Sequence, residues 1–434
     1  MSASNIPTQP LTPAGFPHFH YQQSHLYAEG VSLVDMAKQV GTPAYVYSKS
    51  ALVSAWQGYQ DAIGSRRVLV CYGMKANSNL AVLNVFRALG SGFDIVSGGE
   101  LARVLKIGAD PKKIVFSGVG KQRWEIEQAI KAGVKCFNVE SVSELQLISQ
   151  VATAMQAIAP ISLRVNPDVD AQTHPYISTG LKENKFGIAI DVALATYQTA
   201  MTLPGLKIVG VDCHIGSQIT EVSPYLDALD KLLNLIDTLK QNCITLEHLD
   251  LGGGLGIRYD DETPLAPALL LGAIFNTLDE RGYQDLELVF EPGRSLVGNA
   301  GVLLTQVQFL KHTEACNFAI VDAGMNDLIR PSLYQAWHGV LPLTLPCETL
   351  PSEVYDIVGP VCESGDWLAK RRKLSLKEGD LLAIESAGAY GFVMAGNYNS
   401  RGRPAEVLID GETWHIVRAR ETFEDLIRGE TVPT

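Results

Sequence analysis

The sequence predicts a chain built from a closed (β/α)8 barrel of the TIM type and a second, mainly antiparallel β domain. Two observations carry this prediction. Short apolar runs alternate with longer amphipathic stretches from about 65 to 295, whereas after 300 strand-like runs follow one another with few helices between them. Alternating strands and helices are typical of a parallel sheet covered by helices, and strands separated only by turns are typical of antiparallel sheets.

Eight apolar runs are the predicted barrel strands. They are 68–75, 92–97, 113–118, 135–140, 161–166, 208–216, 246–254 and 286–293. The amphipathic stretches between them include 79–89, 99–108, 123–133 and 143–155, and several end in glycine, which commonly ends a helix. Eight such units in about 230 residues match the size of a (β/α)8 barrel. An open, doubly wound sheet is the alternative.

Both chain ends are predicted to build the β domain. Its expected strands are 301–311, 317–324, 355–362, 380–388, 405–410 and 413–420, joined by AYVYS at 44–48. The predicted division is therefore an N-terminal arm and joining strand over 1–48, the barrel over 49–300 and the β domain over 301–434. The first 24 residues are rich in Pro, Gln and Ser, and we expect a loose arm there.

Composition narrows the function classes. The 434 residues include 35 Lys and Arg against 47 Asp and Glu, a net charge of −12. A general nucleic-acid or anionic-membrane binder needs the opposite sign. No apolar run reaches the roughly 18 residues that a membrane helix needs, and the first ten residues have no signal-peptide pattern. The seven cysteines form no CxxC pair, so we expect reduced thiols, no metal site and a cytoplasmic protein.

The candidate site lies at the C-terminal ends of the barrel strands, where (β/α)8 barrels place their functional residues. The ends of the predicted strands therefore place a lysine, a histidine, a triple glycine, a carboxylate and an arginine on one rim of the barrel. They are Lys75 after the first strand, Arg164 and Asn166 on the fifth, His214, Gly216 and Ser217 after the sixth, Gly252, Gly253 and Gly254 after the seventh, and Glu291, Gly293 and Arg294 after the eighth.

Together these residues favour a pyridoxal phosphate site. Three successive glycines let backbone amides approach a phosphate, although a tight turn explains them equally well. Lys75 is either a lysine at a strand end or, if desolvated, a nucleophile that forms a Schiff base. Glu291 is placed to pair with a pyridine nitrogen. His214 is either a ring that stacks on the cofactor or a core histidine.

The sequence resembles the fold-type III pyridoxal phosphate decarboxylases, and among them the diaminopimelate decarboxylase family. The resemblance rests on motifs that occur in order over nearly the whole chain. They are CYGMKANSN (71–79), HPYISTGLKENKFGI (174–188), CHIGSQ (213–218), LDLGGGLGI (249–257), EPGRSLV (291–297), MNDLIRPSLYQAWH (325–338), GPVCESGD (359–366) and GAYGFVMAGNYN (388–399). One departure is Gly73-Met74 before the lysine, where the family commonly has alanine and a β-branched or aromatic residue.

The resemblance implies roles for individual residues. Lys75 would bind the cofactor covalently, His214 would stack on its ring, and Glu291 would pair with the ring nitrogen. Ser217, Gly254, Pro292, Gly293, Arg294 and Tyr390 would complete the cofactor site. Arg294, Arg330, Tyr334, Glu363 and Tyr390 would recognise the substrate. Without the resemblance, Arg330 would be interpreted as one partner of a surface ion pair.

The implied reaction is decarboxylation of meso-2,6-diaminoheptanedioate to L-lysine and CO2. Arg294 and Arg330 would supply donors to the distal carboxylate, and Glu363 would face the distal ammonium. Cys362 would donate the proton from the neighbouring subunit, which implies a homodimer with shared sites; otherwise Cys362 reads as a small buried hydrophobe. A decarboxylase of ornithine, arginine or carboxynorspermidine, a racemase, and a silent cofactor-binding relative remain as alternatives. With Lys75, Arg294 and Arg330 in it, we expect the pocket to be locally positive.

Overall fold

The chain divides into two compact units. The computed structural model describes residues 17–170, 184–347 and 349–433. The first unit, called the β unit here, consists of residues 1–54, 258–262 and 297–434. The second, called the barrel unit, consists of residues 55–257 and 263–296. The N-terminal 16 residues of the expected arm, and residues 174–183 of one motif, lie outside the described residues.

Within the described residues, eight parallel strands close the barrel. Each barrel strand pairs with the next one along the chain, and β13 pairs back with β5 in the register Leu288 with Val68. All eight predicted strands are confirmed, and the open sheet is excluded. The barrel strands are β5 (Val68–Gly73), β6 (Gly92–Ile95), β7 (Ile114–Phe116), β8 (Cys136–Val139), β9 (Ala159–Asn166), β11 (Leu206–Asp212), β12 (His248–Asp250) and β13 (Glu287–Phe290); the short β10 (Ile188–Ala189) pairs beside β9.

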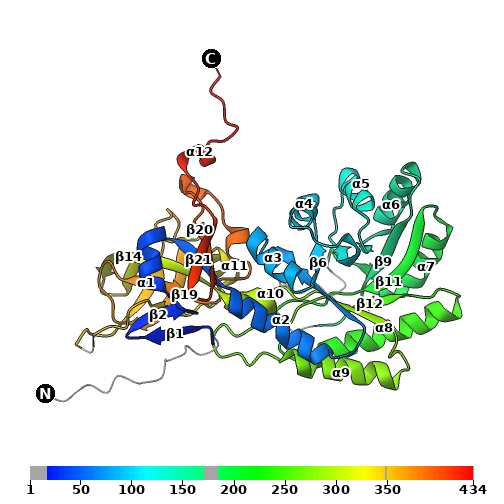
Figure 1. The fold of residues 1–434 in the computed structure, drawn as a ribbon, viewed down its shortest axis with the longest axis horizontal. Coiled ribbons are helices and arrows are strands. Elements are labelled where there is room, and N and C mark those ends of the chain that lie inside the picture. The colour runs from blue at the N-terminus through cyan, green and yellow to red at the C-terminus, as the bar shows by residue number, and fades with distance from the viewer. Residues whose placement is uncertain (1–16, 171–183, 348, 434) are drawn as a thin grey trace. The chain divides into compact units, whose positions relative to one another are not determined.

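Helices surround the barrel strands (Figure 1). They are α2 (Lys49–Ile63), α3 (Leu80–Ala88), α4 (Gly98–Lys106), α5 (Arg123–Ala132), α6 (Val142–Ala154), α7 (Ile190–Thr202), α8 (Ser223–Gln241) and α9 (Pro267–Glu280), with the short α10 (Arg294–Val297) after the last strand. Side-chain caps set several starts: Ser97 accepts from the Glu100 amide at 3.2 Å, and Asn79 accepts from the Ala81 amide at 2.9 Å. Gly133 ends α5 in a left-handed conformation, as its sequence predicts.

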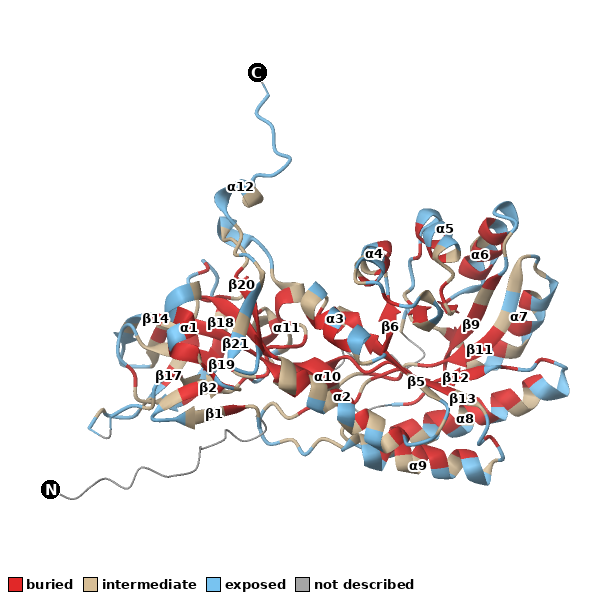
Figure 2. Ribbon diagram, viewed as in Figure 1, coloured by how far each residue is buried: buried red, intermediate tan, exposed pale blue. Residues whose placement is uncertain are grey.

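The barrel strands are buried on both faces (Figure 2). Inside the barrel, Cys71, Val115 and Cys136 pack with Val209 and Val289. Because parallel barrel strands have helices outside and packed side chains inside, they read as continuous apolar runs. The polar residues within these runs therefore have to be paired with one another, and they collect at one end of the barrel.

The β unit has a three-stranded and a nine-stranded sheet. The predicted strand at 44–48 is β4, which pairs antiparallel with β14 and parallel with β20, so segments from both chain ends share one sheet. The remaining elements are β1 (Phe19–Gln22), β2 (His25–Ala28), β3 (Val31–Ser32), α1 (Leu33–Val40), β14 (Gly301–His312), β15 (Asn317–Val321), α11 (Arg330–Tyr334), β16 (Val340–Pro342), β17 (Glu353–Val358), β18 (Trp367–Leu374), β19 (Leu381–Ile384), β20 (Ala405–Asp410), β21 (Thr413–Arg418) and α12 (Phe423–Leu426).

One expectation for the β unit is wrong and one strand was missed. The expected loose arm does not extend to residue 24, because the aromatic strand β1 pairs with β2 and buries Phe19. The strand β18 was not predicted. Its sequence WLAKRRKL is rich in basic residues, and Arg371 takes a left-handed φ of 56° where the pairing with β17 is irregular.

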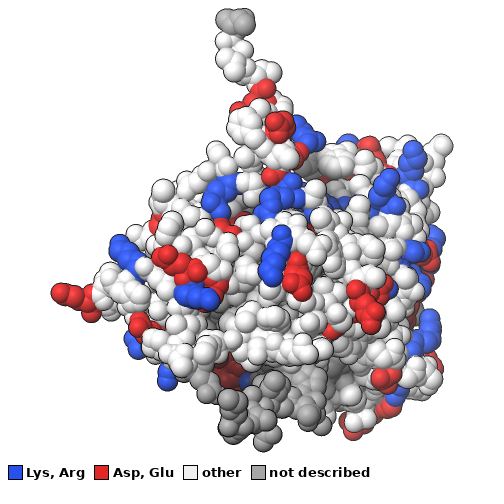
Figure 3. All heavy atoms as spheres, turned by 60° about the vertical axis from the view of Figure 1, so that its left-hand side comes forward, with Lys and Arg blue, Asp and Glu red and all other residues white. Residues whose placement is uncertain are grey.

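Charged side chains of both signs are interspersed on the face that Figure 3 shows, so the net charge of −12 is not gathered into one acidic patch there. Among the described residues, no helix has the length and apolar character that crossing a membrane requires.

Candidate active site

Lys75 lies in a short 3-10 turn, Met74–Ala76, that follows β5 directly. Its Nζ is 2.8 Å from Oδ2 of Asp94, whose side chain is fully buried, whereas the lysine side chain is 37% exposed. A lysine that only extended from a strand end into solvent would not be paired with a buried carboxylate. Close packing favours a glycine at position 73, because a Cβ there would lie 3.3 Å from the Glu291 carbonyl oxygen.

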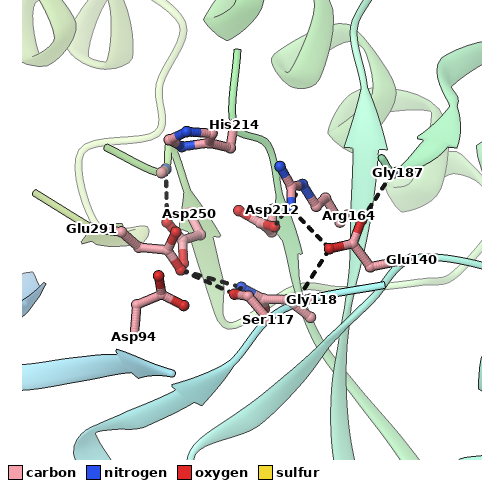
Figure 4. A network of polar contacts seen from close by, with 12 residues as sticks. Asp94, Ser117, Gly118, Glu140, Arg164, Gly187, Asp212, His214, Asp250 and Glu291 are labelled. Atoms are coloured by element: carbon pink, nitrogen blue, oxygen red, sulfur yellow. Dashed lines mark hydrogen bonds and ion pairs between the residues drawn. The ribbon is translucent and has the colours of Figure 1, made fainter. Parts of the chain in front are cut away.

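Glu291 follows β13 and points into a group of buried carboxyl groups. Oxygens of Glu291, Asp250 and Asp212 all lie within 4.8 Å of one another. Ser117 and Asn138 donate to Oε1 of Glu291 at 3.5 and 3.4 Å. Figure 4 shows Asp94 and Asp250 beside Glu291. Neighbouring strands of the barrel thus bring their carboxyl groups to one point.

Glu291 and Asp250 hold protons more tightly than exposed carboxyl groups do. Burial, with the negative charges of Asp250 and Asp94, raises the pKa of Glu291 well above its ordinary value. Burial also raises the pKa of Asp250 to about 7, although the Gly252 amide opposes the rise. Within the described residues, one buried oxygen each of Asp94 and Asp212 has no hydrogen-bond partner. A buried carboxyl group with a raised pKa can share a proton with an aromatic nitrogen base.

The triple glycine allows three loops to meet. A Cβ on Gly252 would lie 2.7 Å from Nδ1 of His214, and one on Gly253 would lie 2.2 Å from the Glu291 carbonyl oxygen. Gly252 has a φ of 64° and Gly254 has a φ of 102°, both left-handed. The amides of Gly252 and Gly253 donate to Asp250 Oδ1 and His214 Nδ1. Two of the three glycine amides therefore donate hydrogen bonds within the protein, and close packing of the three loops explains the glycine motif.

His214 presents a neutral ring at this end of the barrel. Burial, with the positive charges of Lys75 and Arg164, lowers its pKa well below the ordinary value. Because Nδ1 accepts from the Gly253 amide at 3.1 Å, the ring proton is on Nε2. The sequence alone left a core histidine as the alternative; the structure places the ring directly on the glycine loop at the candidate site.

Two arginines also lie at this end of the barrel. Nη2 of Arg294 donates to Oγ of Ser217 at 3.0 Å, so two residues predicted to serve the cofactor are brought together. Arg164 donates to Glu140 at 2.7 Å and lies 3.9 Å from Asp212. Pro292 and Gly293 form the backbone between Glu291 and Arg294, and the Pro292 carbonyl accepts from the Gly73 amide at 3.0 Å.

This end of the barrel contains two of the three cations of the predicted positive pocket, Lys75 and Arg294, whereas Arg330 belongs to the β unit. Among the described residues here, the buried or partly buried cations number fewer than the buried acidic groups. The cations are Lys75, Arg164 and Arg294, and the acidic groups are Asp94, Glu140, Asp212, Asp250 and Glu291. The prediction counted Lys75, Arg294 and Arg330 and did not include most of these carboxyl groups. Burial raises the pKa of Asp212, Asp250 and Glu291, so these three groups can stay protonated, which makes such crowding tolerable.

Apart from Arg294, which lies in the barrel unit, the predicted substrate residues belong to the β unit. Arg330 begins α11 and is 6% exposed, so it is not a surface ion pair. Tyr334 ends the same helix and is half-buried. Tyr390 follows β19 and has a left-handed φ of 55°. These three residues lie on a short helix and a tight turn, not at strand ends.

Cys362 and Glu363 lie in the loop between β17 and β18, and both are exposed. The interpretation of Cys362 as a buried hydrophobe is therefore wrong. Its amide donates to Asn399 at 3.0 Å, and Glu363 accepts from the Tyr398 hydroxyl at 2.8 Å. These two bonds tie the exposed loop to the segment that carries Tyr398 and Asn399.

Asp366 joins this cysteine loop to the region that leads into α11. Its buried carboxylate accepts from the Val361 and Met325 amides, both at 2.6 Å. Ser332 in α11 also donates to the Gly365 carbonyl at 2.6 Å. Within the β unit, the helix that carries Arg330 and the loop that carries Cys362 are therefore joined by short hydrogen bonds.

Comparison with known proteins gives consistent results. Residues 49–298 match the family model described as the pyridoxal binding domain of pyridoxal-dependent decarboxylases. The chain is 59% identical over 414 residues to a diaminopimelate decarboxylase of Pseudomonas aeruginosa, covering 95% of this chain and 99% of that protein. It is 55% identical over 416 residues to a diaminopimelate decarboxylase of Vibrio cholerae, covering 96% of this chain and 99% of that protein.

Solved structures show the same relationship. The diaminopimelate decarboxylase of M. jannaschii in complex with L-lysine superposes with a TM-score of 0.92 at 39% identity, covering 96% of this chain and 99% of that one. The Helicobacter pylori protein of the same name, also with L-lysine, gives a TM-score of 0.87 at 43% identity, covering 91% of this chain and 98% of that one.

Proposed function

Because the chain belongs to the diaminopimelate decarboxylase family, we propose that it removes one carboxylate from meso-2,6-diaminoheptanedioate and releases L-lysine and CO2. It is a carboxy-lyase with pyridoxal 5'-phosphate as its cofactor. The observation that carries the proposal is the meeting of Lys75, His214 and Glu291 at one end of the barrel, in a chain similar to such enzymes over nearly its whole length.

The barrel end fits this cofactor. Glu291 is a buried carboxyl group, and a buried carboxylate suits a partner for a protonated pyridine nitrogen. His214 offers a neutral flat ring, and Ser217 with Arg294 offers donors for a phosphate group. When bound, pyridoxal phosphate accepts the electron pair that the departing carboxylate leaves behind.

Each residue of the barrel end has a separate task. Lys75 supplies the amine that attaches the cofactor, and Asp94 holds its Nζ at 2.8 Å. As a carboxylate, Glu291 would pair with the protonated ring nitrogen and so keep the proton there. Asp250 supports Glu291 by holding the Gly252 turn, whose carbonyl accepts from the Glu291 amide at 2.7 Å.

The residues of the β unit recognise the end of the substrate that does not react. We assign Arg330, with Arg294, to the distal carboxylate, and Glu363 to the distal ammonium. Tyr334 and Tyr390 complete this recognition. Ornithine has no distal carboxylate, so a decarboxylase of ornithine needs no arginine for that group. A buried arginine at position 330 therefore favours diaminopimelate as the substrate.

We also propose that the active form is a cytoplasmic homodimer. Cys362 of the partner subunit would donate the proton to the carbon that has lost its carboxylate. Exposure of Cys362 and Glu363 in a single chain supports this assignment. Mixing the inactive variants Lys75→Ala and Cys362→Ala should restore activity, because one site of a mixed dimer then has both groups. A mixture that exchanges subunits and stays inactive contradicts shared sites.

The experiment that tests the function is product analysis with the cofactor-loaded protein. Incubation with meso-diaminopimelate should give L-lysine and CO2 in equal amounts, whereas ornithine, arginine and carboxynorspermidine should release no comparable CO2. Lys75→Ala should abolish both turnover and the visible absorbance of the bound cofactor, and the exposed Lys106→Ala should preserve them. Faster CO2 release from another substrate would transfer the assignment to that substrate.

A further inference from the structure

Arg330 is held by two aromatic rings inside the β unit. Its Nη1 lies 3.0 Å from Nε2 of His338, and its guanidinium carbon lies 4.6 Å from the centre of the Tyr259 ring. The rings of Tyr259 and His338 meet edge to face, with centres 5.4 Å apart. Arg330 is 6% exposed and His338 is fully buried. The direction of this guanidinium is therefore set inside the protein.

The hydrogen bonds fix the protonation of His338. A guanidinium only donates, so Nε2 of His338 must accept from Arg330. The ring proton is then on Nδ1, which lies 2.7 Å from the Glu385 carbonyl oxygen and donates to it. His338 is thus a neutral ring with one acceptor and one donor, each used.

The backbone of His338 is anchored as well. Nη2 of Arg372 donates to the His338 carbonyl at 2.7 Å, and the Glu385 amide donates to the neighbouring Gly339 carbonyl at 2.9 Å. The ring therefore cannot follow Arg330 if the arginine turns. A fixed acceptor on a fixed backbone restricts where the guanidinium points.

We propose that His338 is a positioning residue for substrate recognition: its Nε2 aims Arg330 at the distal carboxylate of the substrate. This inference rests on the proposed function, in which Arg330 binds that carboxylate. A planar fork recognises a carboxylate only in a narrow range of orientations, so loss of the acceptor weakens binding even though Arg330 and its charge remain.

Two amide substitutions separate the two nitrogens of His338. The amide of glutamine reaches the place of Nε2 and can accept from Arg330, whereas the shorter asparagine reaches the place of Nδ1 and can only keep the bond to Glu385. In the cofactor-loaded enzyme, His338→Asn should raise KM for meso-diaminopimelate by about tenfold, with kcat within about threefold. His338→Gln should bring KM back to within about threefold of the wild type. His415→Asn, at an exposed histidine in β21, is the matched control.

Competitive inhibition identifies which end of the substrate is affected. L-lysine, the proposed product, keeps the distal carboxylate, whereas 1,5-diaminopentane lacks it. His338→Asn should raise the inhibition constant of L-lysine by about tenfold and leave that of 1,5-diaminopentane unchanged. A purely structural role would shift both constants together.

The proposal is overturned if the Asn and Gln variants lose affinity equally, or if both inhibitors weaken in parallel. If the Asn variant does not fold, the Gln variant decides alone, and a tenfold higher KM in it contradicts the proposal. Failure of the proposed function is a separate result, since the wild-type enzyme would then release no CO2 from meso-diaminopimelate.

Discussion

The barrel end and the cysteine loop hold their functional groups in opposite ways. At the barrel end, Glu291 follows β13 and His214 follows β11, and both are held by partners from other parts of the barrel. In the β unit, Cys362 and Glu363 are exposed and depend on a loop that the single carboxylate of Asp366 shapes. The cofactor chemistry is thus built on rigid strands and the proposed proton donor on a loop, which would let that donor meet a second subunit.

The difference also appears in the electrostatics. The barrel end crowds carboxyl groups until their pKa values rise, as for Asp250 and Glu291. The Asp366 carboxylate instead receives two backbone amides, which lower its pKa against the larger rise that burial causes. Substitutions at the barrel end should therefore change proton affinity, whereas substitutions around Asp366 should change geometry.

The largest effect is expected at Glu291. Glu291→Gln removes the group that keeps a proton at the ring nitrogen, so kcat should fall by about 10³-fold while the visible absorbance of bound cofactor remains. Glu287→Gln is the matched control on the same strand, because Glu287 only forms a half-buried ion pair with Lys135. Steady-state kinetics checks this, and an unchanged kcat in Glu291→Gln would remove Glu291 from the reaction.

The next effect is expected in the cysteine loop. Cys362→Ala should lower kcat by about 10²-fold, the usual contribution of a positioned proton donor, and leave cofactor absorbance unchanged. Cys243→Ala, at another exposed cysteine, should have no effect. Undiminished turnover in Cys362→Ala would show that another group donates the proton.

A smaller effect is expected on stability at Asp250. Its pKa of about 7 in the folded protein exceeds the value of about 4 in the unfolded chain, so the folded state holds an extra proton between these pH values. Its contribution to stability is complete below pH ~4 and is lost as the pH rises to ~7. Asp250→Asn keeps an acceptor for the Gly252 amide but removes this dependence.

The thermal melting point of the cofactor-free protein measures this effect. Between pH 5 and pH 7, the fall in Tm should be smaller in Asp250→Asn than in the wild type, by roughly 2–4 °C. Asp227→Asn, at an exposed carboxylate on α8, should fall as the wild type does. Equal falls in all three proteins would mean that Asp250 is ionised throughout this range.

The smallest effect is expected where α11 meets the cysteine loop. Ser332→Ala removes the bond to the Gly365 carbonyl, a loss of about 1 kcal/mol, and should raise KM for meso-diaminopimelate roughly threefold. Cofactor absorbance should not change, because the barrel unit is untouched. An effect on the absorbance instead of KM would contradict the division of tasks between the two units.

The sequence predicted the barrel well because strand ends are readable from apolar runs. Lys75, His214 and Glu291 each stand at the C-terminal end of such a run, which is why the sequence identifies them. Ser117 stands near the end of the third run, so the same criterion could have identified it as well, whereas Asp94 lies in the middle of the second run.

Other residues of the site are not marked by any pattern in the sequence. Asp212 and Asp250 lie inside apolar runs, and parallel barrel strands are buried on both faces, so no alternation shows which residues point inward. The contact of His338 with Arg330 depends on how the chain turns after α11, which the motif that contains both residues does not reveal. The roles of Arg330, Tyr334, Glu363, Tyr390 and Cys362 rest on resemblance alone, because they lie on loops and a short helix that strand periodicity does not locate.

The most direct test offers the cofactor-loaded protein a mixture of equal amounts of meso-diaminopimelate and ornithine and follows CO2 and both amine products. The account predicts L-lysine equal to the CO2 released, with no putrescine. Putrescine as the main product, or no CO2 at all while the cofactor is bound to Lys75, would contradict it.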